Sequence, residues 1–124
     1  MLEKYPSKDL TYKIIGVLYE AYNNLGFGYQ EKYYQRAIGE ELKKEGLRYK
    51  KELINKVEYN KKIIGRYFVD FLIEDRVILE TKVANDFYQK DINQILAYMK
   101  HFDIKLGILS IFTKNGVKVK RLIN

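Results

Sequence analysis

The spacing of hydrophobic residues changes several times along this chain, and each change predicts a different element of secondary structure. Near the N-terminus, apolar residues recur every three or four positions. This spacing predicts a helix that is capped by Ser7, runs to about Asn24 and is ended by Gly26. The same spacing predicts a second helix from about Gln30 to Glu45.

The middle of the chain is rich in β-branched and aromatic residues, which is typical of strands. We expect a basic, partly exposed strand over 47–57, a turn over 59–62, and a hairpin whose two strands cover 63–73 and 77–83. Both faces of this hairpin are largely apolar. We therefore expect helices to cover both sides of the sheet to which it belongs.

The C-terminal part is predicted to form one more helix and two more strands. The helix covers about 87–101, with Asp86 and Gln89 as a capping box. The strands cover 105–112, which is almost wholly apolar and therefore central, and 117–123. The order α-α-β-β-β-α-β-β predicts an α/β fold with a mixed central sheet, in which the third helix permits a parallel crossover.

Composition narrows the class of protein further. The chain has 124 residues, of which 47% are hydrophobic, and this suits a single globular domain over 1–124. It contains no cysteine, so neither a disulfide nor a thiolate metal site is available. No apolar run is long enough to span a membrane, and the N-terminus does not resemble a signal peptide. We therefore expect a cytoplasmic protein that has no contact with membranes.

The formal net charge is +7, and the positive residues are concentrated between Lys43 and Arg66. Such a distribution favours a polyanionic partner such as nucleic acid. A solvated basic surface without a partner explains it equally well, because there is no arginine-rich recognition segment. If nucleic acid is the partner, the residues expected to contact its backbone are Lys50, Lys51, Lys56, Lys61, Lys62 and Arg66.

The central hairpin carries the most informative polar residues. If residues 74–76 form its turn, Asp70 faces Glu80 across the two strands. Opposed carboxylates repel, and a divalent cation and the ammonium group of Lys82 would compensate for that repulsion. A turn of two or four residues would separate them. The alternative is that Asp70 ends a strand at the surface while Glu80 and Lys82 form an exposed ion pair. Alternation predicts one shared side for Phe68, Asp70, Leu72, Ile78, Glu80 and Lys82.

Three further polar residues stand beside the apolar stripes of the predicted helices. Glu31 opens the second helix, where the helix dipole favours a carboxylate and where the side chain could instead be directed into a site. Gln94 and Tyr98 are four residues apart and therefore share one face of the third helix. They form either an exposed polar face or a pair turned towards a metal ion and a phosphate.

Taken together, these residues resemble the GxxExxY family of the PD-(D/E)XK nuclease superfamily. Residues 28–34 match GxxExxY, Asp70 with residues 80–82 matches the split D…(D/E)xK motif, and residues 94–98 match QxxxY. The motifs stand in family order over nearly the whole chain, although Val69 occupies the position of the proline that names the superfamily. The resemblance implies a restriction-endonuclease-like core.

The resemblance also implies a metal-dependent nuclease but not a particular substrate. We expect nucleic acid as the partner, DNA before RNA. Asp70, Glu80 and the backbone carbonyl of Thr81 would bind Mg²⁺ or Mn²⁺, because hard cations prefer oxygen ligands. Glu31 would bind the same ion, a second ion, or a water molecule on the ion.

The other motif residues would act on the substrate. Lys82 would position the attacking water, and Gln94 and Tyr98 would hydrogen-bond the phosphate or that water. The alternative function is a catalytically silent module that binds nucleic acid or protein on the same fold. A homodimer is also compatible with the resemblance, because small nucleases often need two protomers to span a duplex.

Overall fold

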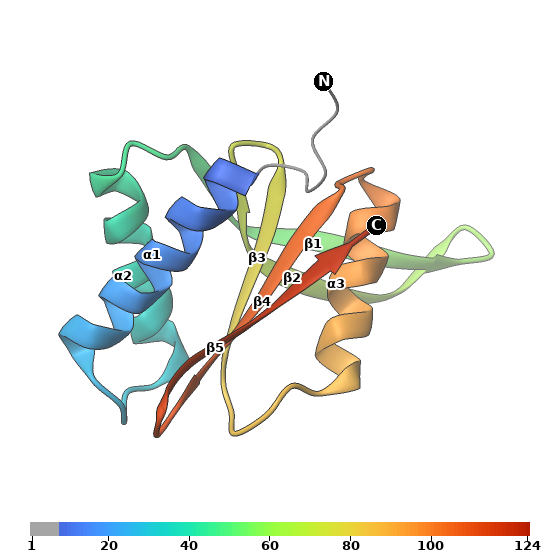
Figure 1. Ribbon diagram of the computed structural model, residues 1–124. Helices are drawn as coiled ribbons and strands as arrows, with labels where there is room; N and C mark the ends of the chain where they lie inside the picture. The colour runs from blue at the N-terminus through green and yellow to red at the C-terminus, as the bar shows by residue number, and fades with distance from the viewer. Residues whose placement is uncertain (1–7) are drawn as a thin grey trace.

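The structure is a computed structural model that describes residues 8–124, so the predicted cap Ser7 lies outside the described residues. Three helices and five strands follow one another in these residues, in the predicted order (Figure 1). They are α1 (Lys8–Leu25), α2 (Glu31–Lys44), β1 (Tyr49–Tyr59), β2 (Lys62–Ile73), β3 (Val77–Val83), α3 (Gln89–His101), β4 (Leu106–Thr113) and β5 (Gly116–Ile123). None of these helices is long and apolar enough to cross a lipid bilayer.

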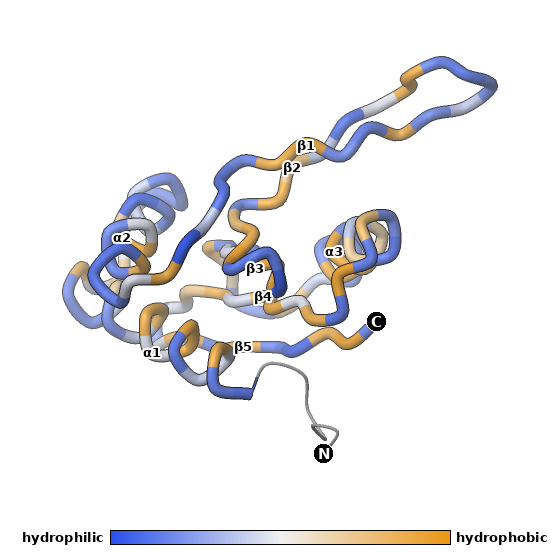
Figure 2. The backbone as a smooth tube through the Cα atoms, turned by 90° about the horizontal axis from the view of Figure 1, so that it is seen from above, coloured by the Kyte–Doolittle hydropathy of each residue, from blue (hydrophilic) through white to orange (hydrophobic). Residues whose placement is uncertain are grey.

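The five strands form one mixed sheet in the order β1-β2-β3-β4-β5. Neighbouring strands are antiparallel except β3 and β4, which are parallel and are connected through α3, as predicted. The predicted three-residue turn is also confirmed, because Ile73 pairs with Val77. Helices α1 and α2 cover one side of the sheet and α3 covers the other (Figures 1 and 2). The predicted α/β fold is therefore confirmed.

Each side of the sheet packs into its own apolar cluster. Phe71 and Leu79 pack with the buried stripes of α1 and α2. Ile78, which points to the opposite side, packs with Ile95 and Met99 of α3. Because both sides are covered, β4 is buried along its whole length, as expected for a central strand.

The distal part of the β1–β2 hairpin, residues 54–68, projects beyond the rest of the sheet, and we call it the arm (Figures 1 and 2). Strand β2 pairs with β1 over most of its length but with β3 only over 71–73. The expectation that both faces of β2 are covered is therefore wrong in the arm. Ile64 is 66% exposed and Phe68 is 54% exposed, because β3 has already separated from β2 there.

The ends of the elements differ from the predictions by at most two residues, and differences of two residues occur at both ends of β1 and at the start of α3. This helix begins at Gln89, and the predicted capping box is wrong. The Asp86 carboxylate accepts a hydrogen bond from the adjacent backbone N–H of Phe87, at 2.8 Å. Tyr88 is the N-cap residue, with an extended backbone and no capping hydrogen bond from its side chain.

Candidate active site

Asp70 and Glu80 stand at the fork where β2 and β3 separate. The last regular pair of the ladder is Phe71 with Leu79, one position before the two acids. Beyond it, the acidic side chains take over the hydrogen bonding between the strands. The backbone N–H of Asp70 donates to Glu80 Oε1 at 3.1 Å, and the backbone N–H of Thr81 donates to Asp70 Oδ2 at 2.8 Å. The two carboxyl groups therefore lie opposite each other, as the three-residue turn requires.

The backbone of the hairpin is irregular at this point. Opposite Asp70, Glu52 of β1 adopts a left-handed conformation with φ 53°. Val69 packs on the α3 side of the sheet, whereas Phe71 packs on the side of α1 and α2. Strict alternation would place both on one side, so β2 must turn about its axis at Asp70. The side of the hairpin that Phe68, Asp70 and Leu72 were predicted to share therefore extends along β2 only as far as Asp70. Phe68, which lies beyond Asp70, is exposed.

The two carboxyl groups are shielded from water. Glu80 is only 2% exposed, so the alternative of an exposed Glu80–Lys82 ion pair is wrong. Burial, followed by the charge of Asp70, raises the pKa of Glu80 to about 9. Burial also raises the pKa of Asp70 above its ordinary value. Two opposed carboxyls whose pKa values are both raised share one proton near neutral pH, and a cation can replace that proton.

Lys82 follows Glu80 by two residues on β3 and brings a positive charge to the fork. Burial alone would lower the pKa of the half-buried Lys82 ammonium group. The negative charges of Glu80 and Glu31 outweigh that effect, so the pKa of Lys82 is raised. Lys82 therefore remains protonated at neutral pH and places a positive charge beside the acids.

Helix α2 adds Glu31 and Gln35 to the fork. Glu31 Oε1 accepts a hydrogen bond from the backbone N–H of Val83 at 3.3 Å. The Gln35 amide donates to Asp70 Oδ1 at 3.1 Å and to Glu31 Oε2 at 3.5 Å. Burial raises the pKa of Glu31, and the nearby Lys82 opposes that shift. Gln35 was not predicted as a site residue. Its place four residues after Glu31, on the same face of the helix, was the available signal.

Asp91 is a second residue that the sequence analysis missed. It lies in the first turn of α3 and is only 9% exposed. Its negative charge acts on both Lys82 and Glu31, so the start of α3 borders the fork. The signal was its place four residues before Ile95, on the apolar stripe of the helix.

The two other predicted residues of α3 lie apart from the acids. Gln94 is exposed, and its side chain makes no hydrogen bond within the described part of the chain. Tyr98 is 3% exposed, and its ring centroid lies 4.4 Å from that of Phe102. Burial, followed by the neighbouring Tyr67, raises the pKa of Tyr98. Hydrogen bonds thus connect Glu31, Asp70 and Glu80 to the fork, and charge interactions connect Lys82 to them. No such interaction connects Gln94 or Tyr98 to these acids among the described residues.

The donor set at the fork suits one type of metal ion better than others. Within residues 8–124, no three or more acidic or histidine side chains are grouped closely enough to form a complete metal cage. Mg²⁺ typically takes one or two carboxylates and keeps several water molecules. The opposed pair Asp70 and Glu80 fits this requirement. The Thr81 hydroxyl is engaged with Ser110 of β4 at 2.9 Å, which fixes β3 at the site.

The predicted basic residues are all exposed and lie on β1, on β2 and, for Lys61, in the turn between these strands. Lys50 forms an exposed ion pair with Asp75 at 3.3 Å. The members that belong to the arm are Lys56, Lys61, Lys62 and Arg66. The positive side chains therefore extend outward from the fork along the hairpin.

A shallow pocket of about 300 Å³ opens next to Val83, the residue that binds Glu31. It is lined by Phe27, Val83, Ala84, Asn85 and Tyr88. The segment between β3 and α3 therefore forms one rim of the site.

Comparisons with known proteins identify the family. The sequence matches the family model of the PD-(D/E)XK nuclease superfamily over residues 8–122, which include every element around the fork. No curated protein gives a significant match. The fold is similar to the crystal structure of SSO0001, with a TM-score of 0.51 and 13% sequence identity, over 97% of this chain and 80% of that chain. The chain belongs to the PD-(D/E)XK nuclease superfamily.

Proposed function

We propose that the protein is a divalent-metal-dependent nuclease of the GxxExxY group that hydrolyses phosphodiester bonds in nucleic acid, with DNA as the preferred substrate. The observation that carries this proposal is the fork at which Asp70 and Glu80 oppose each other next to Lys82. The GxxExxY segment, residues 28–34, supports the group assignment because its glutamate is Glu31.

The ion would be Mg²⁺ or Mn²⁺, held by Asp70 and Glu80, with the carbonyl of Thr81 as a further oxygen donor. Glu31 would bind a water molecule on the ion, because no third acidic side chain is close enough to complete a metal cage within residues 8–124. Superfamily nucleases of this kind generally use divalent metals. When bound, the ion polarises the phosphate and lowers the pKa of the attacking water. The buried carboxyl pair releases its shared proton when the ion binds, so the affinity for the ion rises with pH.

The protein supplies orientation and charge around the acids. Gln35 and the N–H of Thr81 each hold one oxygen of Asp70, so this carboxylate has a fixed orientation. Lys82 offsets the negative charge that develops on the phosphate in the transition state. Asp91 helps to keep Lys82 protonated and is a positioning residue.

The helix α3 and the basic hairpin would contact the substrate further from the cleaved bond. Gln94 is exposed three residues after Asp91 and is available to a phosphate of the bound strand. Tyr98 would support this surface from beneath through its packing. The basic residues of the β1–β2 hairpin would hold the nucleic-acid backbone, which makes the affinity sensitive to salt and indifferent to sequence. A second copy of the chain would let the protein reach both strands of a duplex.

Nuclease assays with Mg²⁺ and Mn²⁺ test the proposal. The wild type should cleave DNA only when a divalent ion is present. Lys82→Ala should reduce the rate about 100-fold or more, because a fixed charge at the transition state is lost. The matched control is Lys118→Ala, at an exposed lysine of the edge strand β5. Equal rates for the wild type and Lys82→Ala would exclude this site. An inactive wild type that still binds nucleic acid would indicate a silent binding module.

A further inference from the structure

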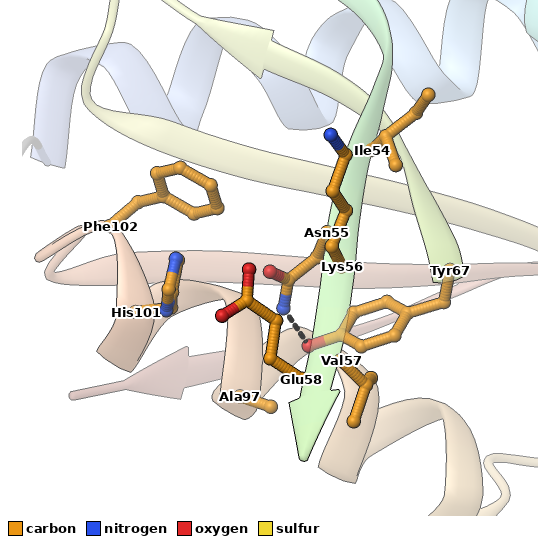
Figure 3. A pocket seen from close by; sticks show the side chains of 9 residues that line it. All are labelled: Ile54, Asn55, Lys56, Val57, Glu58, Tyr67, Ala97, His101 and Phe102. Atoms are coloured by element: carbon orange, nitrogen blue, oxygen red, sulfur yellow. Dashed lines mark hydrogen bonds between the residues drawn. The ribbon is translucent and has the colours of Figure 1, made fainter. Parts of the chain in front are cut away.

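A second cavity, separate from the acids, opens between the arm and the C-terminal end of α3 (Figure 3). It has a volume of about 610 Å³ and is lined by residues of β1, β2 and the end of α3. This volume lies within the range of small-molecule sites, which is about 300–1,000 Å³. Apart from Lys56, none of its lining residues has a role in the mechanism proposed above.

One side of this cavity is aromatic. Phe102 is 45% exposed, and its ring is supported by Tyr98 and by His101, with ring centroids 4.4 Å and 4.6 Å away. The ring of Tyr67, which comes from β2, stands on the opposite side of the cavity in Figure 3. Exposed rings that neighbouring rings hold in place are suitable surfaces for stacking, and every nucleobase offers a flat face to them.

The part of the cavity formed by β1 is polar. Asn55 is only 6% exposed, and its amide nitrogen donates to the Tyr67 hydroxyl. This bond fixes the amide and turns its Oδ1 towards the cavity (Figure 3). The exposed Glu58 points to the same side, towards His101 (Figure 3). An amide oxygen and a carboxylate close to aromatic rings can accept hydrogen bonds from the N–H groups on the edge of a base.

The position of the cavity relates it to the acids. Tyr67 lies three residues before Asp70 on β2, which is about 10 Å along an extended strand. The cavity also lies on the basic arm, where Lys56 is one of its lining residues and can hold a phosphate. A nucleotide seated here would therefore be near the cleaved bond but not part of it.

We propose that this cavity binds an unpaired nucleobase of the substrate strand, so that the substrate is single-stranded or locally unpaired next to the cleavage site. This inference rests on the proposed nuclease function and specifies its substrate class. A base in a duplex cannot enter, because its neighbours cover both of its faces and its partner covers its pairing edge. The aromatic rings give affinity without sequence preference, whereas Asn55 and Glu58 favour bases that carry an exocyclic amino group, which thymine lacks.

Fluorescence anisotropy with a short single-stranded DNA, in EDTA so that no cleavage occurs, tests the inference. The wild type should bind this DNA at least fivefold more tightly than the same strand with abasic sites. Phe102→Ala should lose about fivefold to 100-fold in affinity and bind both strands equally, because a stacking contact is lost. Phe102→Trp should keep the preference for the strand that carries bases. The control, Tyr12→Ala, changes an 81% exposed aromatic residue of α1 and should have no effect.

A second variant tests the inference even if Phe102→Ala fails to fold. Glu58 is exposed, so Glu58→Gln should fold normally, and it should weaken the binding of cytosine or adenine homopolymers more than that of thymine homopolymers. Equal binding of base-bearing and abasic strands by the wild type would overturn the inference. The same conclusion follows if Phe102→Ala melts like the wild type and binds equally well.

Cleavage is scored separately from binding. A protein that cleaves DNA but binds abasic strands equally well retains the nuclease function and loses the base pocket. A protein with base-dependent binding and no cleavage supports the pocket and contradicts the nuclease function.

Discussion

Asp70 donates its backbone N–H to the carboxylate of Glu80 at 3.1 Å, at the position where the β2–β3 ladder would otherwise continue. The carboxylate of Asp70 in turn accepts the N–H of Thr81, on the same strand as Glu80. The same two side chains therefore keep the fork hydrogen-bonded and form the candidate metal site. Substitutions at these two residues are expected to affect both stability and activity, so each needs a readout for both.

The metal-free protein should become less stable as the pH rises. The pKa of Glu80 is raised from its ordinary value of 4.5 to about 9 in the folded state. Between these values the folded state binds more protons than the unfolded state, so the free energy of unfolding decreases with increasing pH. The contribution of Glu80 is complete below about pH 4.5 and is lost as the pH approaches about 9. Thermal melts in EDTA should show a falling melting temperature across this window.

Two comparisons check the origin of that trend. Glu80→Gln cannot titrate at this position and should have a flatter pH dependence than the wild type. Saturating Mn²⁺ should flatten the dependence of the wild type too, because the cation takes the place of the shared proton. An identical slope for wild type and Glu80→Gln would show that this carboxyl is not the group responsible.

Gln35 should be important for activity although no sequence motif includes it. Its amide holds Asp70 Oδ1 at 3.1 Å. Gln35→Leu removes this hydrogen bond and should lower kcat about 10- to 100-fold, as is usual for groups that orient metal ligands. Gln35→Glu should be worse, because it places another negative charge next to Asp70. Steady-state cleavage rates measure both effects, and two variants with wild-type rates would remove Gln35 from the site.

The packing of α3 on β4 depends on Gly107. A Cβ atom added there would come within 2.7 Å of Met99 Sδ and 2.9 Å of Ile95 Cγ2. Gly107→Ala should therefore destabilise the protein by about 1–3 kcal/mol, as overpacked cores do. The control is Gly65→Ala in the arm, where the nearest atom is Val57 Cβ at 4.0 Å. Urea unfolding gives both values, and equal stability of the two variants would contradict this packing.

Local patterns were sufficient to predict much of the fold and the centre of the site. The polar residues 74–76 between two apolar strands predicted the turn, and the turn fixed the register that brings Asp70 opposite Glu80. The helical spacing of apolar residues predicted the three helices to within two residues at each end. These features depend on neighbours along the chain or on a single hairpin, which a sequence displays directly.

Features that depend on distant parts of the chain could not be predicted in this way. The arm is exposed because β3 separates from β2. An apolar residue such as Ile64 is the same in the sequence whether or not a helix covers it, so the local sequence cannot reveal this exposure. Gln35 and Asp91 reach the fork because α2 and α3 converge there from opposite sides of the sheet. The capping box failed because the backbone remains extended through Tyr88, which delays the start of α3.

Anomalous diffraction from a crystal soaked in Mn²⁺ examines the fork itself. We expect one strong peak in contact with the carboxylates of both Asp70 and Glu80, and no such peak in crystals of Asp70→Asn. A peak at another position, or a wild-type fork that stays empty at millimolar Mn²⁺, would contradict the proposed metal site and the nuclease mechanism that depends on it.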